Sequence, residues 1–335
     1  MKIKKEYIIL VLIIIVLSVY LYKRSADRTL YELPKLAQID EKALTKLEIT
    51  RDKTVLVLNK KDDKWYIAPA EYPTDANKVK DMLNAIKNFD LTALVSESQN
   101  YNLYELDEGQ KINVKAFQGD SLILDIDVGK SASSFRHTFV RPSGDERVFH
   151  ARGNLKNTFD VTVESIRDKT VLSLKTAEIQ QLNINKEQQS LAFTRTQVPV
   201  AVSAQDADKN TEAAAPAPTS APKQAWQAAT GQPVNESALN QLLNTLANLR
   251  CEKFIDDRKK EDFKSPLFTI ELKDGQEYKL SIFSKAEEND PNYPAVSSGS
   301  DYPFELSTSQ VDRIMKDPAT FLQAPETDPK KSESE

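Results

Sequence analysis

Apolar residues recur with helical spacing in two segments of the chain, residues 73–89 and 233–249. In PTDANKVKDMLNAIKNF and in PVNESALNQLLNTLANL, the apolar positions follow at steps of three, one, three and three. Such steps place the side chains on one face of a helix. The two sets are separated by a constant 160 positions: Val79, Met82, Leu83, Ile86 and Phe89 correspond to Leu239, Leu242, Leu243, Leu246 and Leu249. The pattern predicts two equivalent amphipathic helices.

Strand-like segments flank both helices in the same order. A strand that contains a tryptophan precedes each helix, and two strands joined by a tight turn follow it. In the second half this turn is Asp274-Gly275, a strong hairpin signal between alternating strands. Each half closes with a strand and a short helix, and Ser307 with Gln310 offers a capping box for the last helix. The corresponding segments are 44–50 and 179–185, 91–97 and 251–257, and 148–159 and 303–314.

This repetition predicts an α+β fold of two tandem copies, each a mixed or antiparallel sheet with helices on one face. We expect the first repeat at 44–175 and the second at 176–324. Residues 198–224 are rich in Ala, Pro, Ser and Thr, so we expect a disordered insertion in the second repeat. The tail, residues 325–335, is expected to be disordered as well.

An apolar run near the N-terminus predicts a membrane anchor. Residues 7–22, YIILVLIIIVLSVYLY, carry no charge, and lysine or arginine flanks both ends. Sixteen helical residues span about 24 Å, and flanking lysines and tyrosines can bridge the rest of a hydrocarbon core of roughly 30 Å. A cleaved signal peptide would need small residues after the run, where Tyr-Leu-Tyr-Lys-Arg stands. We expect one retained transmembrane helix, preceded by residues 1–6 and followed by a juxtamembrane linker, residues 23–43.

Composition narrows the functional classes. The net charge of −5 comes from 45 basic and 50 acidic residues. The two signs are intermixed along the chain, which argues against a nucleic-acid-binding protein. Eight glycines and two histidines leave little material for phosphate-binding loops or histidine metal sites. Cys251 is the single cysteine, so no intrachain disulfide can form. It corresponds to Leu91 in the first repeat, which indicates a small buried apolar residue.

Asp125 and Asp127 alternate with apolar residues in one predicted strand, so both carboxylates project from the same face. Two such carboxylates could hold a cation or act as an acid/base pair, which gives a hydrolase as the less favoured alternative. The preferred interpretation is the solvated face of a half-buried strand. The second repeat has Ser281 and Phe283 in the comparable stretch, so we do not expect the repeats to share a site.

Two other motifs suggest chemistry but lack the residues that would complete it. Residues 129–131, Gly-Lys-Ser, resemble the end of a phosphate-binding loop, but Leu124 stands where that motif requires glycine. His137 and His150 lie near opposite ends of a predicted hairpin that could bring them close. No further ligands accompany them in the sequence, which favours ordinary strand-end histidines over a metal site.

Residues beside the two predicted helices have structural explanations. Trp65 and Trp226 precede the helices at equivalent positions, which favours core packing over a ligand groove. Asn235 begins a formal glycosylation sequon, but its place at a helix start favours an N-cap role, for which Thr74 or Asp75 is the counterpart. The sequence therefore assigns no catalytic, cofactor-binding or metal-binding residue, and we expect neither a cofactor nor an enzyme.

The chain resembles a bacterial envelope family known as a domain of unknown function, DUF4340. The resemblance extends over roughly residues 44–322 and is carried by LEIT with Trp65, by ANKVKDMLNAIKNF, by ILDIDVGK and by IRDKTVL. It implies a membrane-anchored protein with a cytoplasmic N-terminus and a periplasmic body, often beside gliding-motility-type ABC transporter components. The family supplies no catalytic residues.

We therefore expect a non-enzymatic accessory or scaffold protein, anchored by a single pass in the inner (cytoplasmic) membrane. Its expected partners are the membrane and envelope or ABC transporter proteins, and nucleic acid is not expected. The first alternative is a periplasmic module that binds a glycan, lipid or small molecule in the cleft between the repeats. The second alternative is the hydrolase that would use Asp125 and Asp127.

Overall fold

The computed structural model describes residues 5–26, 31–34, 38–187, 189–198 and 223–323, and within the first range it describes the side chains of 11–21. The chain divides into two compact units, unit 1 (Met1–Asp168) and unit 2 (Lys169–Glu335), each with its own hydrophobic core.

The boundary between the units lies seven residues before the predicted one at 175/176. The reason is that β10 (Thr170–Ser173), which the sequence assigned to the first repeat, pairs with β14 (Asn248–Arg250) of unit 2.

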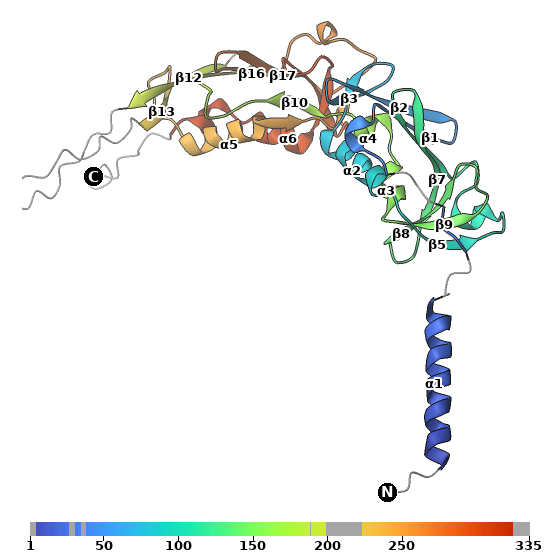
Figure 1. The fold of residues 1–335 in the computed structure, drawn as a ribbon. Helices are drawn as coiled ribbons and strands as arrows, with labels where there is room; N and C mark the ends of the chain where they lie inside the picture. Colours follow the sequence, from blue (N-terminus) through green and yellow to red (C-terminus); the bar gives the residue numbers. More distant parts are fainter. Residues whose placement is uncertain (1–4, 27–30, 35–37, 188, 199–222, 324–335) are drawn as a thin grey trace, which may run out of the picture. The chain divides into compact units, whose positions relative to one another are not determined.

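The N-terminal apolar run forms helix α1, Lys5–Ala26, which contains the predicted span of residues 7–22 (Figure 1). Its described large apolar side chains, between residues 11 and 21, are 51% to 60% exposed. In the part of the chain that the structure describes, no helix is long and apolar enough to cross a membrane. The transmembrane helix therefore stays a prediction.

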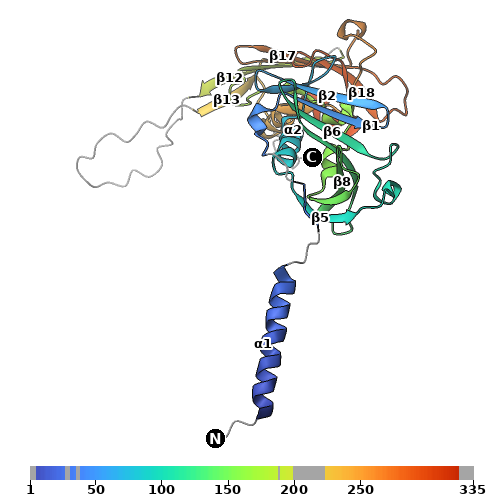
Figure 2. The same cartoon turned by 45° about the vertical axis from the view of Figure 1, so that its right-hand side comes forward.

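In the described part of unit 1, nine strands form one antiparallel sheet with the order β4-β3-β2-β1-β6-β7-β8-β9-β5. Figure 2 shows β2, β1 and β6 of this sheet. The strands are β1 (Lys46–Arg51), β2 (Thr54–Lys61), β3 (Lys64–Ile67), β4 (Tyr72–Pro73), β5 (Leu91–Ser96), β6 (Ile112–Gln118), β7 (Ser121–Ser131), β8 (His137–Pro142) and β9 (Val148–Arg152).

One face of the unit 1 sheet packs against short helices, of which α2 (Ala76–Lys87) is the longest. Asp75 caps α2, since its carboxylate accepts a hydrogen bond from the backbone N–H of Asn77 at 3.0 Å. The buried stripe of α2 joins the sheet residues in a single core: Val79, Met82, Leu83 and Ile86. Helices α3 (Leu155–Phe159) and α4 (Val163–Ile166) follow the last strands, and α2 contacts α3.

In the described part of unit 2, eight strands form a second antiparallel sheet with the order β13-β12-β11-β16-β17-β18-β19-β15. Helices α5 (Glu236–Leu246) and α6 (Thr308–Ile314) lie on one side of it (Figure 1). The strands are β11 (Gln181–Lys186), β12 (Gln189–Val198), β13 (Lys223–Ala228), β15 (Lys253–Phe254), β16 (Phe268–Lys273), β17 (Glu277–Ile282), β18 (Asn292–Ser297) and β19 (Phe304–Ser307).

The two sheets repeat one topology. From β3 to β5 in unit 1 and from β13 to β15 in unit 2, the strands follow in the same order. An isolated bridge ties the start of each long helix to the end of its unit, Thr74 to Arg167 in unit 1 and Val234 to Leu322 in unit 2. The predicted two-unit sheet fold is confirmed. Every ladder between the described strands is antiparallel, so of the two predicted sheet types the antiparallel one is correct.

The structure shortens both predicted helices. Phe89 follows the end of α2 and is only partly buried, and Leu249 is buried from strand β14. The helical stripes therefore end at Ile86 and Leu246, because the chain turns into a strand directly afterwards. Most of the predicted insertion, 199–222, and the predicted tail, 325–335, lie outside the described residues. The ends of the insertion, 198 and 223–224, belong to β12 and β13.

Candidate functional site

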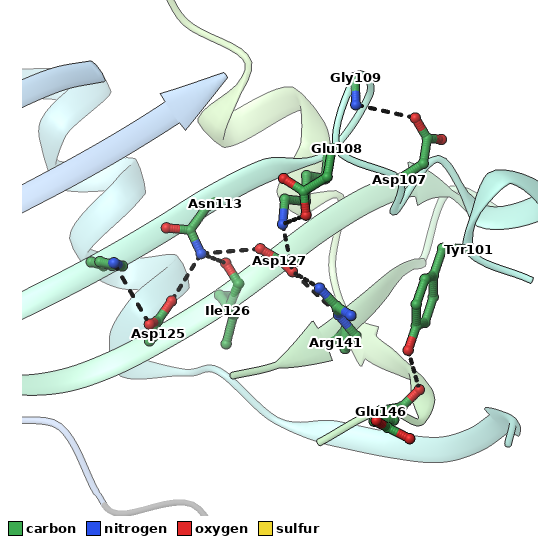
Figure 3. Close-up of polar contacts among 12 residues, drawn as sticks. Tyr101, Asp107, Glu108, Gly109, Asn113, Asp125, Ile126, Asp127, Arg141 and Glu146 are labelled. Atoms are coloured by element: carbon green, nitrogen blue, oxygen red, sulfur yellow. Dashed lines mark hydrogen bonds and ion pairs between the residues drawn. The ribbon is translucent and has the colours of Figure 1, made fainter. Parts of the chain in front are cut away.

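Asp127 lies at the centre of a polar cluster on the unit 1 sheet (Figure 3). Its neighbours along β7 point into the core, so its carboxylate projects from the opposite face, yet the residue is only 6% exposed. Its Oδ2 accepts hydrogen bonds from Arg141 Nη2 at 2.6 Å, Arg141 Nε at 3.2 Å and Lys111 Nζ at 3.4 Å. Its Oδ1 accepts one from Asn113 Nδ2 at 3.0 Å.

Asp125 belongs to the same cluster. Asn113 Nδ2 donates to Asp125 Oδ1 at 2.8 Å as well as to Asp127, so one amide joins both carboxylates. The predicted shared face is confirmed, but the solvated-face interpretation is wrong for Asp127. The ion pairs cover its carboxylate, and the Tyr101 ring lies 4.5 Å from the guanidinium carbon of Arg141.

A groove of about 580 Å³ opens beside the cluster. Its cations are paired with carboxylates of the same groove: Lys111 lies 2.6 Å from Glu108, and Lys115 lies 3.9 Å from Asp125. The acidic lining residues outnumber the basic ones, so the groove does not favour an anionic ligand: Glu108, Asp125, Asp127, Asp145 and Glu146 against Lys111, Lys115 and Arg141.

The hydrogen bonds of Asp127 limit its chemistry. Three of the four hydrogen bonds that Asp127 receives end on Oδ2 and one ends on Oδ1, so both carboxylate oxygens are engaged by neighbouring side chains. Burial lowers the pKa of Arg141, but its hydrogen bonds to Asp127 and Tyr101 outweigh burial and raise that pKa above the ordinary value. The described residues contain no group of three or more His, Cys, Asp or Glu side chains that could hold a metal ion. The geometry therefore fits a cluster that stabilises the sheet better than it fits an acid/base pair.

The second unit has a different polar pair at the corresponding place. In β16 and β17, Thr269 and Ser281 are both buried, and their hydroxyl oxygens lie 3.4 Å apart. The sequence comparison placed Ser281 and Phe283 in this stretch; by ladder register Ser281 lies at the position of Asp127, whereas Phe283 lies at the position of neither aspartate. The equivalent residues are Lys279 for Asp125, Ser281 for Asp127 and Val296 for Arg141.

Sequence reasoning did not find Asn113 or Arg141. Asn113 pairs with Asp127 across β6 and β7, but this ladder shifts register between Ala116 and Phe117, so counting outward from the turn would have placed Ile126 opposite Asn113. Arg141 also pairs with Asp127, across β7 and β8, but this ladder contains a register shift that the sequence does not show.

The Gly-Lys-Ser motif forms the end of strand β7, and a turn follows it instead of a helix. A phosphate-binding loop needs a helix N-terminus at this point. Gly129 has a packing role, since a Cβ atom here would collide with the backbone carbonyl oxygen of Tyr104. The glycine lets the short helix η2 (Tyr101–Tyr104) approach the strand.

His137 and His150 come together as predicted, with ring centroids 5.6 Å apart and ring planes at 28°. Among the described residues, no third His, Cys, Asp or Glu side chain joins them in a group that could hold a metal ion. The Nε2 atom of His150 is buried without a hydrogen-bond partner. Burial of this ring, and next the neighbouring His137, lowers the pKa of His150 below its ordinary value of 6.5.

The lowered pKa of His150 predicts a loss of stability in acid. The unfolded chain binds the proton more readily, so stability is full above the unfolded pKa of about 6.5 and falls as the pH drops below it. In a Trp226→Phe background, Trp65 emission reports the unfolding of unit 1. When the pH is lowered from about 8 to about 5, we expect the urea midpoint of unit 1 to decrease. The decrease should be smaller in the His150→Phe variant. An equal fall in both proteins would contradict the prediction.

The remaining candidates have the predicted structural roles. Trp65, Trp226 and Cys251 are buried in the two cores. Asn235 caps α5, since its side-chain oxygen accepts a hydrogen bond from the backbone N–H of Ala238 at 3.2 Å.

Comparison with known proteins gives one match. Residues 65–267, more than half of the chain, match the family model described as Domain of unknown function (DUF4340). The match begins in β3 of unit 1 and ends before β16 of unit 2, so it crosses the boundary between the units. No curated protein and no solved structure matches.

Proposed function

Since the chain belongs to the DUF4340 family, a family without an assigned activity, we propose that it is a membrane-anchored, non-enzymatic accessory protein. In this proposal the two antiparallel-sheet units stand outside the cytoplasm and serve as contact surfaces for an envelope complex. The observation that carries the proposal is helix α1, whose apolar side chains belong to neither protein core among the described residues.

The exposure of α1 supports an anchor. Ten apolar residues between 11 and 21 each leave half or more of their surface uncovered. An apolar surface of this size on a soluble protein requires a covering partner, and a lipid bilayer would cover all sides of the helix at once. The sequence adds basic residues at both ends of the run and charge-free residues between them.

The polar cluster supports a role without catalysis. Asp125 and Asp127 are the strongest pair of candidate catalytic carboxylates, and their hydrogen bonds already join three strands of the unit 1 sheet. The resemblance noted from the sequence directs the choice of partner to ABC transporter components of the envelope.

The test is crosslinking of the full chain in native membranes, followed by identification of the crosslinked proteins. The matched control carries Ile14→Asp and Leu17→Asp, which should abolish the anchor, because a charge at the centre of a span costs about 3 kcal/mol. We expect the natural chain to capture a transporter or envelope subunit repeatedly, and the control to lose it together with the membrane fraction. Repeated recovery of no envelope protein by the natural chain would contradict the proposal.

A further inference from the structure

The turn between β7 and β8 presents an exposed aromatic side chain. Phe135 is 71% exposed, more than any other large apolar residue in the described part of the chain. Phenylalanine usually contributes its large apolar surface to a core or an interface. The position of Phe135 therefore suggests that a partner covers this turn.

The backbone of the turn prevents Phe135 from folding back. Its φ of 55° lies in the left-handed region, which a bulky side chain rarely adopts. The N–H of Phe135 donates to the carbonyl of Ala132 at 2.8 Å, and the N–H of Ala132 donates to the carbonyl of His137 at 2.8 Å. The N–H of Gly153 donates to the carbonyl of Arg136, also at 2.8 Å, so the turn is held on both sides. These bonds keep the ring directed outward.

The surroundings of Phe135 are basic. Residues 129–137, GKSASSFRH, contain Lys130 and Arg136 and no acidic residue. Arg152 lies at the same end of the β8–β9 ladder, because it pairs with His137. Its carboxylate partner Asp90 is 3.5 Å away, and both side chains are more than half exposed, so this ion pair is weak. An aromatic tip among basic side chains matches an anionic lipid surface.

The length of the chain keeps unit 1 near the end of α1. Leu33 packs against the unit 1 core and follows Ala26, the last residue of α1, by seven positions. Seven extended residues span at most about 25 Å. If α1 is embedded in a bilayer, some surface of unit 1 must therefore face that bilayer closely.

We propose that the turn of residues 132–136 docks on the membrane that holds α1. Phe135 enters the interfacial layer, and Lys130, Arg136 and Arg152 face anionic lipid headgroups. This inference rests on the proposed membrane anchoring. It adds a second contact, which would fix the orientation of unit 1 above the bilayer.

The test uses the full chain in lipid vesicles that contain brominated lipid, which quenches nearby tryptophan. Phe135→Trp places a probe on the turn, and Leu122→Trp places the matched control on an exposed site near the other end of β7. The natural chain gives the background of Trp65 and Trp226. In vesicles with anionic lipid we expect quenching and a blue shift for Phe135→Trp, and neither for Leu122→Trp.

Two further measurements separate the possible failures. Adding Arg136→Ala to Phe135→Trp should lower the ratio of docked to undocked protein roughly fivefold, and neutral vesicles should weaken docking further. A chain that does not float with the vesicles would overturn the proposed anchoring itself. A chain that floats but shows no more quenching at position 135 than at position 122 would overturn the docking alone. The docking would also be overturned if the fluorescence of Phe135→Trp changed only when a membrane protein was added to the vesicles.

Discussion

Replacing Met82 by alanine is expected to lower the free energy of unfolding of unit 1 by about 3 kcal/mol, within the range of roughly 2–5 kcal/mol for such core truncations. The side chain is 1% exposed and lies in the α2 stripe that packs against the sheet. Leu242 occupies the equivalent place in α5, is also 1% exposed, and should show a similar loss in unit 2.

One tryptophan in each unit lets the two losses be measured separately. Urea unfolding is followed by Trp65 emission in a Trp226→Phe background and by Trp226 emission in a Trp65→Phe background. Because the two cores share no residue, Met82→Ala should shift only the first transition and Leu242→Ala only the second. Losses below about 1 kcal/mol, or equal shifts of both transitions by either substitution, would contradict two equivalent and separate cores.

Replacing Asp127 by alanine is expected to destabilise unit 1 by about 2–3 kcal/mol. The substitution leaves Arg141 and Lys111 without their shared carboxylate, and breaking a buried ion pair usually costs 3–5 kcal/mol. We expect a smaller loss because the side chains of Arg141 and Lys111 remain 22% and 17% exposed.

The control for this substitution is Asp125→Ala, measured by the same Trp65 emission. Asp125 accepts one hydrogen bond from Asn113 and lies 3.9 Å from Lys115, so its loss should cost about 1 kcal/mol or less. If Asp127→Ala lowered the free energy of unfolding of unit 1 no more than Asp125→Ala does, the cluster around Asp127 would not be what stabilises the sheet.

The repeated fold could be predicted because its signals are local. Each signal depends on a few neighbouring positions: the helical stripes that recur after 160 residues, the alternating strands, and the capping residues Asp75 and Asn235. The unit boundary could not be predicted, since the assignment of β10 depends on its pairing with β14, which lies far along the chain.

The candidate site was only partly predictable for the same reason. Strand alternation placed Asp125 and Asp127 on one face, which the structure confirms. It could not show that Asp127 is buried, because burial depends on Arg141, which reaches the carboxylate through an irregular ladder. The basic surroundings of Phe135 could not be predicted in full for the same reason, since Arg152 belongs to a separate strand, β9, and comes near the turn through its pairing with His137.

Alkaline extraction of membranes, combined with protease treatment of spheroplasts, tests the proposed membrane anchoring most directly. An anchored chain with an external body should stay in the membrane pellet at alkaline pH. Added protease should degrade units 1 and 2 while a cytoplasmic marker protein stays intact. Release of the chain into the alkaline supernatant, or a body protected from protease until the spheroplasts are lysed, would contradict this arrangement.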